Sequence, residues 1–200
     1  MVTGQVVKDL RRALKSGKPV RVIRAIDGAD RLDAYVVALG RRWVLLHTVS
    51  GGMHLDGHSV VRLRDVEHAT RSGWSGARVA HRALHLRGER PWAPANVDLD
   101  TTTGLIDTLS GAFPLVSVYA EEIAPDICHI GRPHGVTRKK NLRLQEISPR
   151  AVWESACSRH RVADITRFDV GDGYLDALHT VGGDLTRSGC CSGGRGIRCR

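Results

Sequence analysis

Hydrophobic and polar positions follow two different periods along the first half of the chain. Apolar residues recur at helical spacing at Val6, Val7, Leu10, Ala13 and Leu14, and Gly17 followed by Pro19 ends this helix. After Pro19 the apolar residues largely alternate with polar ones, which is typical of half-buried strands. We therefore predict strands over 20–26, 32–39, 42–49 and 58–69, followed by a closing helix over 77–86.

The second half follows the same plan with a weaker period. Thr101 and its two neighbouring threonines can cap a helix whose apolar residues are Leu105, Ile106 and Leu109. We predict strands over 115–119, 127–135, 141–147 and 159–169, and a last helix over 174–181.

Short segments of the first half return in the second at an offset of about 95 residues. The segment around Pro19 matches that around Pro114, and the segment around Leu84 matches that around Leu178. We interpret the chain as two modules with a linker and a tail. The first module covers 1–90, the linker 91–100, the second module 101–186, and a disordered basic tail 187–200.

The order of helices and strands, with segments such as Trp43–Leu46 and Asp164–Asp169, resembles a tandem of Sm-like barrels. It is similar to an uncharacterised bacterial family in which two such modules are joined. The resemblance implies a mainly β fold with flanking helices (α+β): two small antiparallel barrels, each with an N-terminal and a C-terminal helix. Arg64-Asp65 stands where the family has an Arg-Gly pair, and this departure argues against base recognition of the Sm type.

Charge divides unevenly between the modules. Residues 1–95 hold 17 basic and 8 acidic residues, whereas residues 96–186 hold 9 basic and 13 acidic residues. The tail adds four arginines and no acidic residue. Opposite charges can attract the modules to each other, within one chain or between chains, and a polyanion is expected to bind the first module.

Nucleic-acid binding is the most specific hypothesis that the basic residues allow. Six arginines lie on predicted strands or turns of the first module, where alternation turns several outward: Arg21, Arg24, Arg41, Arg42, Arg62 and Arg64. Against this, aromatic residues make up 4% of the chain, and Trp43 lies in an apolar run that indicates burial. A solvated basic face that confers solubility is the alternative.

The candidate catalytic and metal-binding residues give weak signals. His54 and His58 flank a predicted turn, so we interpret them as exposed histidines without helical ligand spacing. Five residues supply enough ligand types for a zinc site: Cys128, His129, His134, Cys157 and His160. Only Cys157 and His160 have ligand-like spacing, and a structural zinc site needs four converging groups. Acidic residues such as Glu121 next to Glu122 are interpreted as solvated turns. We predict no catalytic residue, no metal and no cofactor.

The function predicted from these observations is binding rather than catalysis. No apolar run is long enough to span a membrane and the first residues lack the apolar core of a signal peptide, so we expect a cytoplasmic protein without membrane contact. The preferred interpretation is an assembly module that binds a protein partner or a second copy of itself through sheet edges and complementary charge. Nucleic-acid binding through the first module is the alternative, and a metal-dependent enzyme is a remote one.

Overall fold

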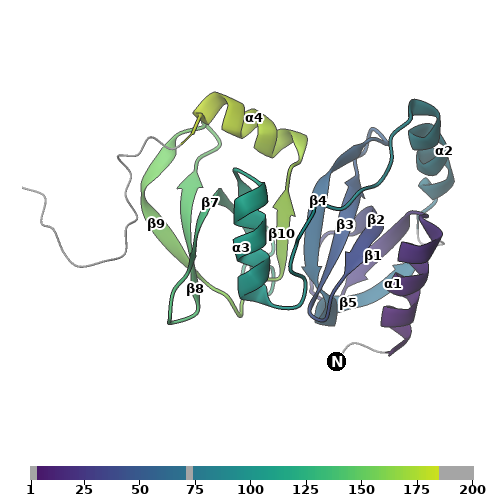
Figure 1. Ribbon diagram of the computed structural model, residues 1–200, viewed down its shortest axis with the longest axis horizontal. Helices are drawn as coiled ribbons and strands as arrows, with labels where there is room; N and C mark the ends of the chain where they lie inside the picture. The colour runs from purple at the N-terminus through teal and green to yellow at the C-terminus, as the bar shows by residue number, and fades with distance from the viewer. Residues whose placement is uncertain (1–3, 71–73, 185–200) are drawn as a thin grey trace, which may run out of the picture.

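The computed structural model of the chain describes residues 4–70 and 74–184, and all its strands belong to one sheet (Figure 1). The first half contains α1 (Gly4–Ser16), β1 (Val20–Arg24), β2 (Leu32–Leu39), β3 (Trp43–Val49), β4 (Leu55–Arg62), the 3-10 helix η1 (Leu63–Asp65), β5 (Val66–Thr70) and α2 (Ala77–Arg87). The second half contains α3 (Thr102–Ala112), β6 (Val116–Tyr119), β7 (Cys128–Val136), β8 (Asn141–Ile147), β9 (Trp153–Arg161), β10 (Arg167–Val170) and α4 (Gly173–Gly182). The predicted tail, 187–200, lies outside the described residues.

The sheet has ten strands in the order β5-β1-β2-β3-β4-β10-β6-β7-β8-β9, and every neighbouring pair is antiparallel. The two halves meet where β4 pairs with β10, with Val60 opposite Phe168 and Ser59 opposite Asp169. Among the described residues, β5 pairs with β1 alone and β9 with β8 alone. The sheet is therefore open, with β5 and β9 as its edges.

This open sheet shows that the prediction of two closed Sm-like barrels was wrong. A barrel closes when its first and last strands satisfy each other's backbone groups. Here β4 and β10, which belong to different halves, satisfy each other's backbone hydrogen-bonding groups instead. The helices predicted over 77–86 and 174–181 are confirmed as α2 and α4.

Two segments predicted as single strands are each divided into two. The segment 58–69 breaks at η1, so that β4 pairs with β3 while β5 crosses to pair with β1. The segment 159–169 breaks after Arg161, where Asp164 N–H donates to the Arg161 carbonyl at 3.0 Å in a tight turn. Both breaks let the chain change its strand partner.

The two halves share a hydrophobic core beneath α3, which lies over the middle of the sheet (Figure 1). Trp43 and Val60 of the first half pack with Leu105 and Phe168 of the second, and the Trp43 and Phe168 rings are 5.6 Å apart. Burying apolar side chains from both halves together stabilises them as one unit. Among the helices described, none is both long and apolar enough to cross a membrane.

Candidate anion-binding pocket

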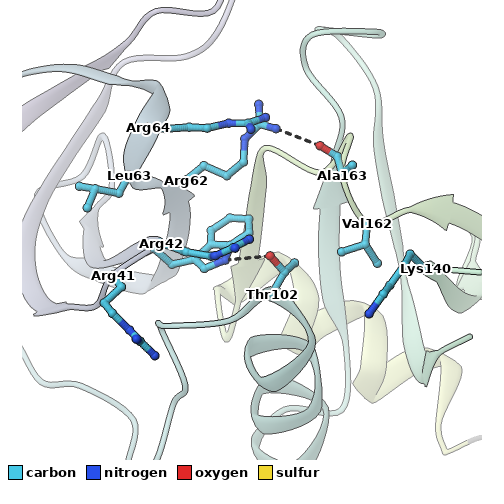
Figure 2. A pocket seen from close by; sticks show the side chains of 10 residues that line it. Arg41, Arg42, Arg62, Leu63, Arg64, Thr102, Lys140, Val162 and Ala163 are labelled. Atoms are coloured by element: carbon cyan, nitrogen blue, oxygen red, sulfur yellow. Dashed lines mark hydrogen bonds between the residues drawn. The ribbon is translucent and has the colours of Figure 1, made fainter. Parts of the chain in front are cut away.

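A pocket of about 520 Å³ opens where the two halves meet, beside the first turn of α3 (Figure 2). We call it the basic pocket. Its lining residues are Arg41, Arg42, Trp43, Arg62, Leu63, Arg64, Thr102, Lys140, Val162 and Ala163. Half of these residues carry a positive charge and none of them is acidic, so the lining suits an anion.

Two turns of the first half supply the arginines. Arg42 lies in the β2–β3 turn, and its backbone N–H donates to the carbonyl of Leu99 at 3.1 Å. The Leu63 N–H donates to the carbonyl of Arg42 at 2.8 Å, which ties this turn to η1. The backbone therefore holds Arg41 and Arg42 next to Arg62 and Arg64.

The second half supplies a helix end and a lysine. Thr101 caps α3 by accepting from the Gly104 N–H at 3.0 Å, and Thr102 accepts from Trp43 Nε1 at 3.3 Å. The first turn of α3 therefore faces the basic pocket with the positive end of its dipole. Lys140, at the end of the β7–β8 turn, is held by the Val162 N–H, which donates to its carbonyl at 3.0 Å.

Arg62 is the buried cation of the basic pocket. It donates to Asp65 and, at 3.1 Å, to the Ala163 carbonyl in the other half (Figure 2). Its Nη2 lies 2.9 Å from a carboxylate oxygen of Glu122 but is not aligned for a hydrogen bond. Burial raises the pKa of Asp65, although the hydrogen bond and charge of Arg62 oppose this. The charge of Arg62 is thus paired with the carboxylates of Asp65 and Glu122.

The exposed cations of the basic pocket differ in how far they are neutralised. Arg41 pairs with Asp100 at 3.1 Å, and Arg64 lies 3.5 Å from Asp65. Arg42 and Lys140 are exposed, and neither has an ion pair within the described part of the chain. These two cations are therefore available to a bound anion.

Of the six arginines predicted to contact nucleic acid, the structure brings four together in the basic pocket. The other two lie elsewhere. Arg21 makes two hydrogen bonds of 2.7 Å to the carboxylate of Asp33, and Arg24 is buried against Glu121. Both guanidinium groups are thus bound to carboxylates outside the basic pocket.

The sequence interpretation missed Lys140 and Thr102 as lining residues. A signal for Lys140 was present, because Arg138, Lys139 and Lys140 form a basic run between two predicted strands. Thr102 was predicted in a helix cap, but its position beside Trp43 depends on contact between the halves. The linker makes this contact, since Leu99 accepts from the backbone N–H groups of both Arg42 and Trp43.

The interpretation of His58 as an exposed turn residue was wrong. His58 is buried on β4, and its ring stacks on His47 with 4.2 Å between centroids. The Trp92 N–H donates to His47 Nδ1 at 3.2 Å, and His58 Nε2 lies 3.0 Å from the Trp92 carbonyl. Burial, with the charge of His58, lowers the pKa of His47 to about 4. The neutral imidazole rings of His47 and His58 thus hold the linker in place at Trp92.

Glu121 is likewise buried rather than solvated. It accepts a hydrogen bond of 2.7 Å from Arg24 Nη2 and another of 2.7 Å from Thr166 Oγ1. Burial acts to raise the pKa of Glu121, but the hydrogen bonds from Arg24 and Thr166 outweigh it, and the pKa is lowered. This ionised pair links β1 to the second half of the sheet.

Comparison with known proteins adds no assignment: no family model, curated protein or solved structure matches the chain. The chemistry of the basic pocket therefore indicates what it can bind. Guanidinium and ammonium groups form a set of hydrogen-bond donors for phosphate or carboxylate oxygens.

Proposed function

We propose that the protein binds single-stranded nucleic acid, with backbone phosphates in the basic pocket. The observation that carries this proposal is the pair of exposed cations, Arg42 and Lys140, on opposite sides of a pocket without acidic lining. Arg41 and Arg64 extend the positive surface on the side of Arg42 (Figure 2). Phosphate groups that replace condensed counterions at such a surface supply sequence-independent affinity.

The shape of the site favours a single strand over a duplex. A single strand can bend to bring consecutive phosphates into a recess, whereas a duplex presents its phosphates on a stiff cylinder. Trp43 lies in the lining but is 1% exposed and is packed against Phe168, so it offers no face for stacking on a base. We therefore propose phosphate-led binding with little sequence preference.

A salt-dependent titration tests this proposal. Fluorescence anisotropy of a labelled single-stranded oligonucleotide would be measured at about 50 and about 200 mM salt. Contacts from Arg42 and Lys140 to about two phosphates predict a log–log slope of about −1.4 and a roughly 7-fold loss of affinity over this range. Absence of binding at the lower salt concentration would overturn the proposal.

Charge reversal locates the binding surface. The double variant Arg42→Glu/Lys140→Glu should weaken binding at least about tenfold, because it removes two phosphate contacts and adds repulsion. The matched control is Lys8→Glu/Arg12→Glu on α1, which makes the same change of charge on the far side of the first half (Figure 1). If the α1 variant loses as much affinity as the pocket variant, the basic pocket is not the binding surface.

Assembly through sheet edges is a second candidate function, favoured by the way the halves join. β4 and β10 are the adjoining edges of the two halves and pair over four residues. β9, in the acidic half, and β5, in the basic half, are the remaining edges and can pair head to tail between copies. Light scattering should show mass increasing with concentration, and a constant monomer mass would contradict this candidate.

A further inference from the structure

A second cluster of polar side chains lies on β7, β8 and β9, apart from the basic pocket. His129 Nδ1 is 3.1 Å from one carboxylate oxygen of Glu146, and His160 Nε2 is 3.4 Å from the other. One ligand atom from each of these three residues lies within 4.8 Å of the other two. Three neighbouring strands thus direct two imidazoles and one carboxylate toward one point.

Strand register explains why residues distant in the sequence meet here. β8 lies between β7 and β9, with Glu146 opposite Gly131 on one side. On the other side, the pairing with β9 shifts between Gln145 and Ile147, so the irregularity falls at Glu146. The extra residues of this irregularity, 154–156, lie on β9. Glu146 thus stands on β8 between the two strands that carry His129 and His160.

We infer that His129, Glu146 and His160 bind a divalent transition-metal ion, with Zn²⁺ as the best fit. Two imidazoles and a carboxylate form a ligand set typical of zinc sites that keep a position for water. Ligand atoms about 2.1 Å from a tetrahedral ion lie about 3.4 Å from each other. The two histidine nitrogens lie 3.1 and 3.4 Å from different oxygens of Glu146, and the three ligand atoms lie within 4.8 Å of one another. An ion can enter with small side-chain shifts.

The surroundings of the cluster suit a bound ion with a water ligand. The side chains of His129, Glu146 and His160 are 38%, 26% and 15% exposed, so solvent reaches the remaining coordination position. Ser158 Oγ donates to the Leu144 carbonyl at 3.1 Å and lies 2.8 Å from His160 Nε2. This contact to Ser158 occupies the nitrogen that would bind the ion, so it must be given up when the metal enters.

The prediction of no metal weighed His129 among the candidate ligands but took only Cys157 and His160 to have ligand-like spacing. On a strand, residues three apart point to opposite faces, so this spacing does not bring both ligands to one ion. The structure instead places His160 with Glu146 and His129. The inference is independent of the basic pocket and of nucleic-acid binding.

Metal titration of the full chain, prepared without a histidine tag, tests the inference. Isothermal titration calorimetry with Zn²⁺ alone should give one site per chain at micromolar affinity. His160→Ala and Glu146→Gln should each weaken that site at least tenfold, while circular dichroism confirms that both variants remain folded. The matched control is His54→Ala, which removes a histidine that pairs with Glu89 at 2.8 Å without a third ligand. That variant should bind Zn²⁺ as the wild type does.

Co²⁺ spectroscopy separates this site from binding by cysteines. Ligation by His129, Glu146 and His160 should give visible d–d absorption without thiolate-to-cobalt charge-transfer bands, and His160→Ala should abolish the d–d absorption. Absence of Zn²⁺ binding, binding that is unchanged in both cluster variants, or strong thiolate charge-transfer bands would each overturn the inference.

Discussion

Mild acid should destabilise the protein because His47 is buried as a neutral imidazole. His47 is 3% exposed and its ring stacks on His58. Burial is the main cause that lowers its pKa from 6.5 to about 4, and the charge of His58 adds to it. Protonation in the folded protein would place a cation between a second histidine and the linker. The unfolded chain takes up the proton more readily.

The sign and size of the effect follow from these two pKa values. Between pH 6.5 and about pH 4 the unfolded chain binds more protons at His47 than the folded protein, so stability falls as the pH falls. Between about pH 7 and about pH 5, the lowered pKa of His47 alone reduces the free energy of unfolding by about 2 kcal/mol. The pKa of His58 is also lowered by burial, and His58 therefore acts in the same direction.

Urea unfolding at these two pH values tests the prediction. In the variant His47→Asn, the amide oxygen can still accept from the Trp92 N–H but does not titrate. The loss of stability on acidification should therefore shrink by about 2 kcal/mol. The control is His68→Asn, because His68 has an exposed side chain and lies outside the core. If His47→Asn loses as much stability between the two pH values as the wild type, the argument is refuted.

Two substitutions test the contacts between the halves. Glu121→Gln should lower the free energy of unfolding in urea by about 3 kcal/mol, because it leaves the buried guanidinium of Arg24 without its anionic partner. The control is Glu122→Gln, which changes the exposed neighbouring residue and should lower the free energy of unfolding by less than about 1 kcal/mol. Equal losses for the two variants would contradict the role of Glu121 as the buried partner of Arg24. Gly40→Ala should cost about 2 kcal/mol, since its Cβ would overlap the linker backbone. Thermal unfolding should show no comparable loss for Gly51→Ala, where the space is open, and an unchanged Tm for Gly40→Ala would refute this packing argument.

The helices were predictable because their signals are local. The spacing of Val6, Leu10 and Ala13 defines the buried face of α1, and Thr101 caps α3 as predicted. That the strands form one open sheet and not two closed barrels was not predictable, because it depends on which strand pairs with β4. Polar and apolar residues alternate along Arg167–Val170, but this alternation does not show that β4 is the partner strand, and all four positions of β10 are buried.

The candidate site residues also divide into those that a local sequence signal predicts and those that depend on contacts between distant segments. Arg41, Arg42, Arg62 and Arg64 come together because two turns of the same half lie side by side. Other pairs depend on long-range pairing, as with Arg24 and Glu121, which are 97 residues apart. The histidine and glutamate cluster joins residues of three strands, and the sequence named His129 and His160 as candidate ligands but gave no sign of Glu146 between them.

The most direct test of nucleic-acid binding follows the arginine side chains themselves. An unlabelled single-stranded oligonucleotide would be titrated into ¹⁵N-labelled protein, with the arginine Nε–Hε signals assigned by substitution. Binding in the basic pocket predicts saturable shifts of the signals of Arg41, Arg42 and Arg64, while those of Arg11 and Arg12 on α1 stay in place. Shifts confined to the α1 arginines, or no shifts at saturating oligonucleotide, would contradict the assignment of the basic pocket as the binding site.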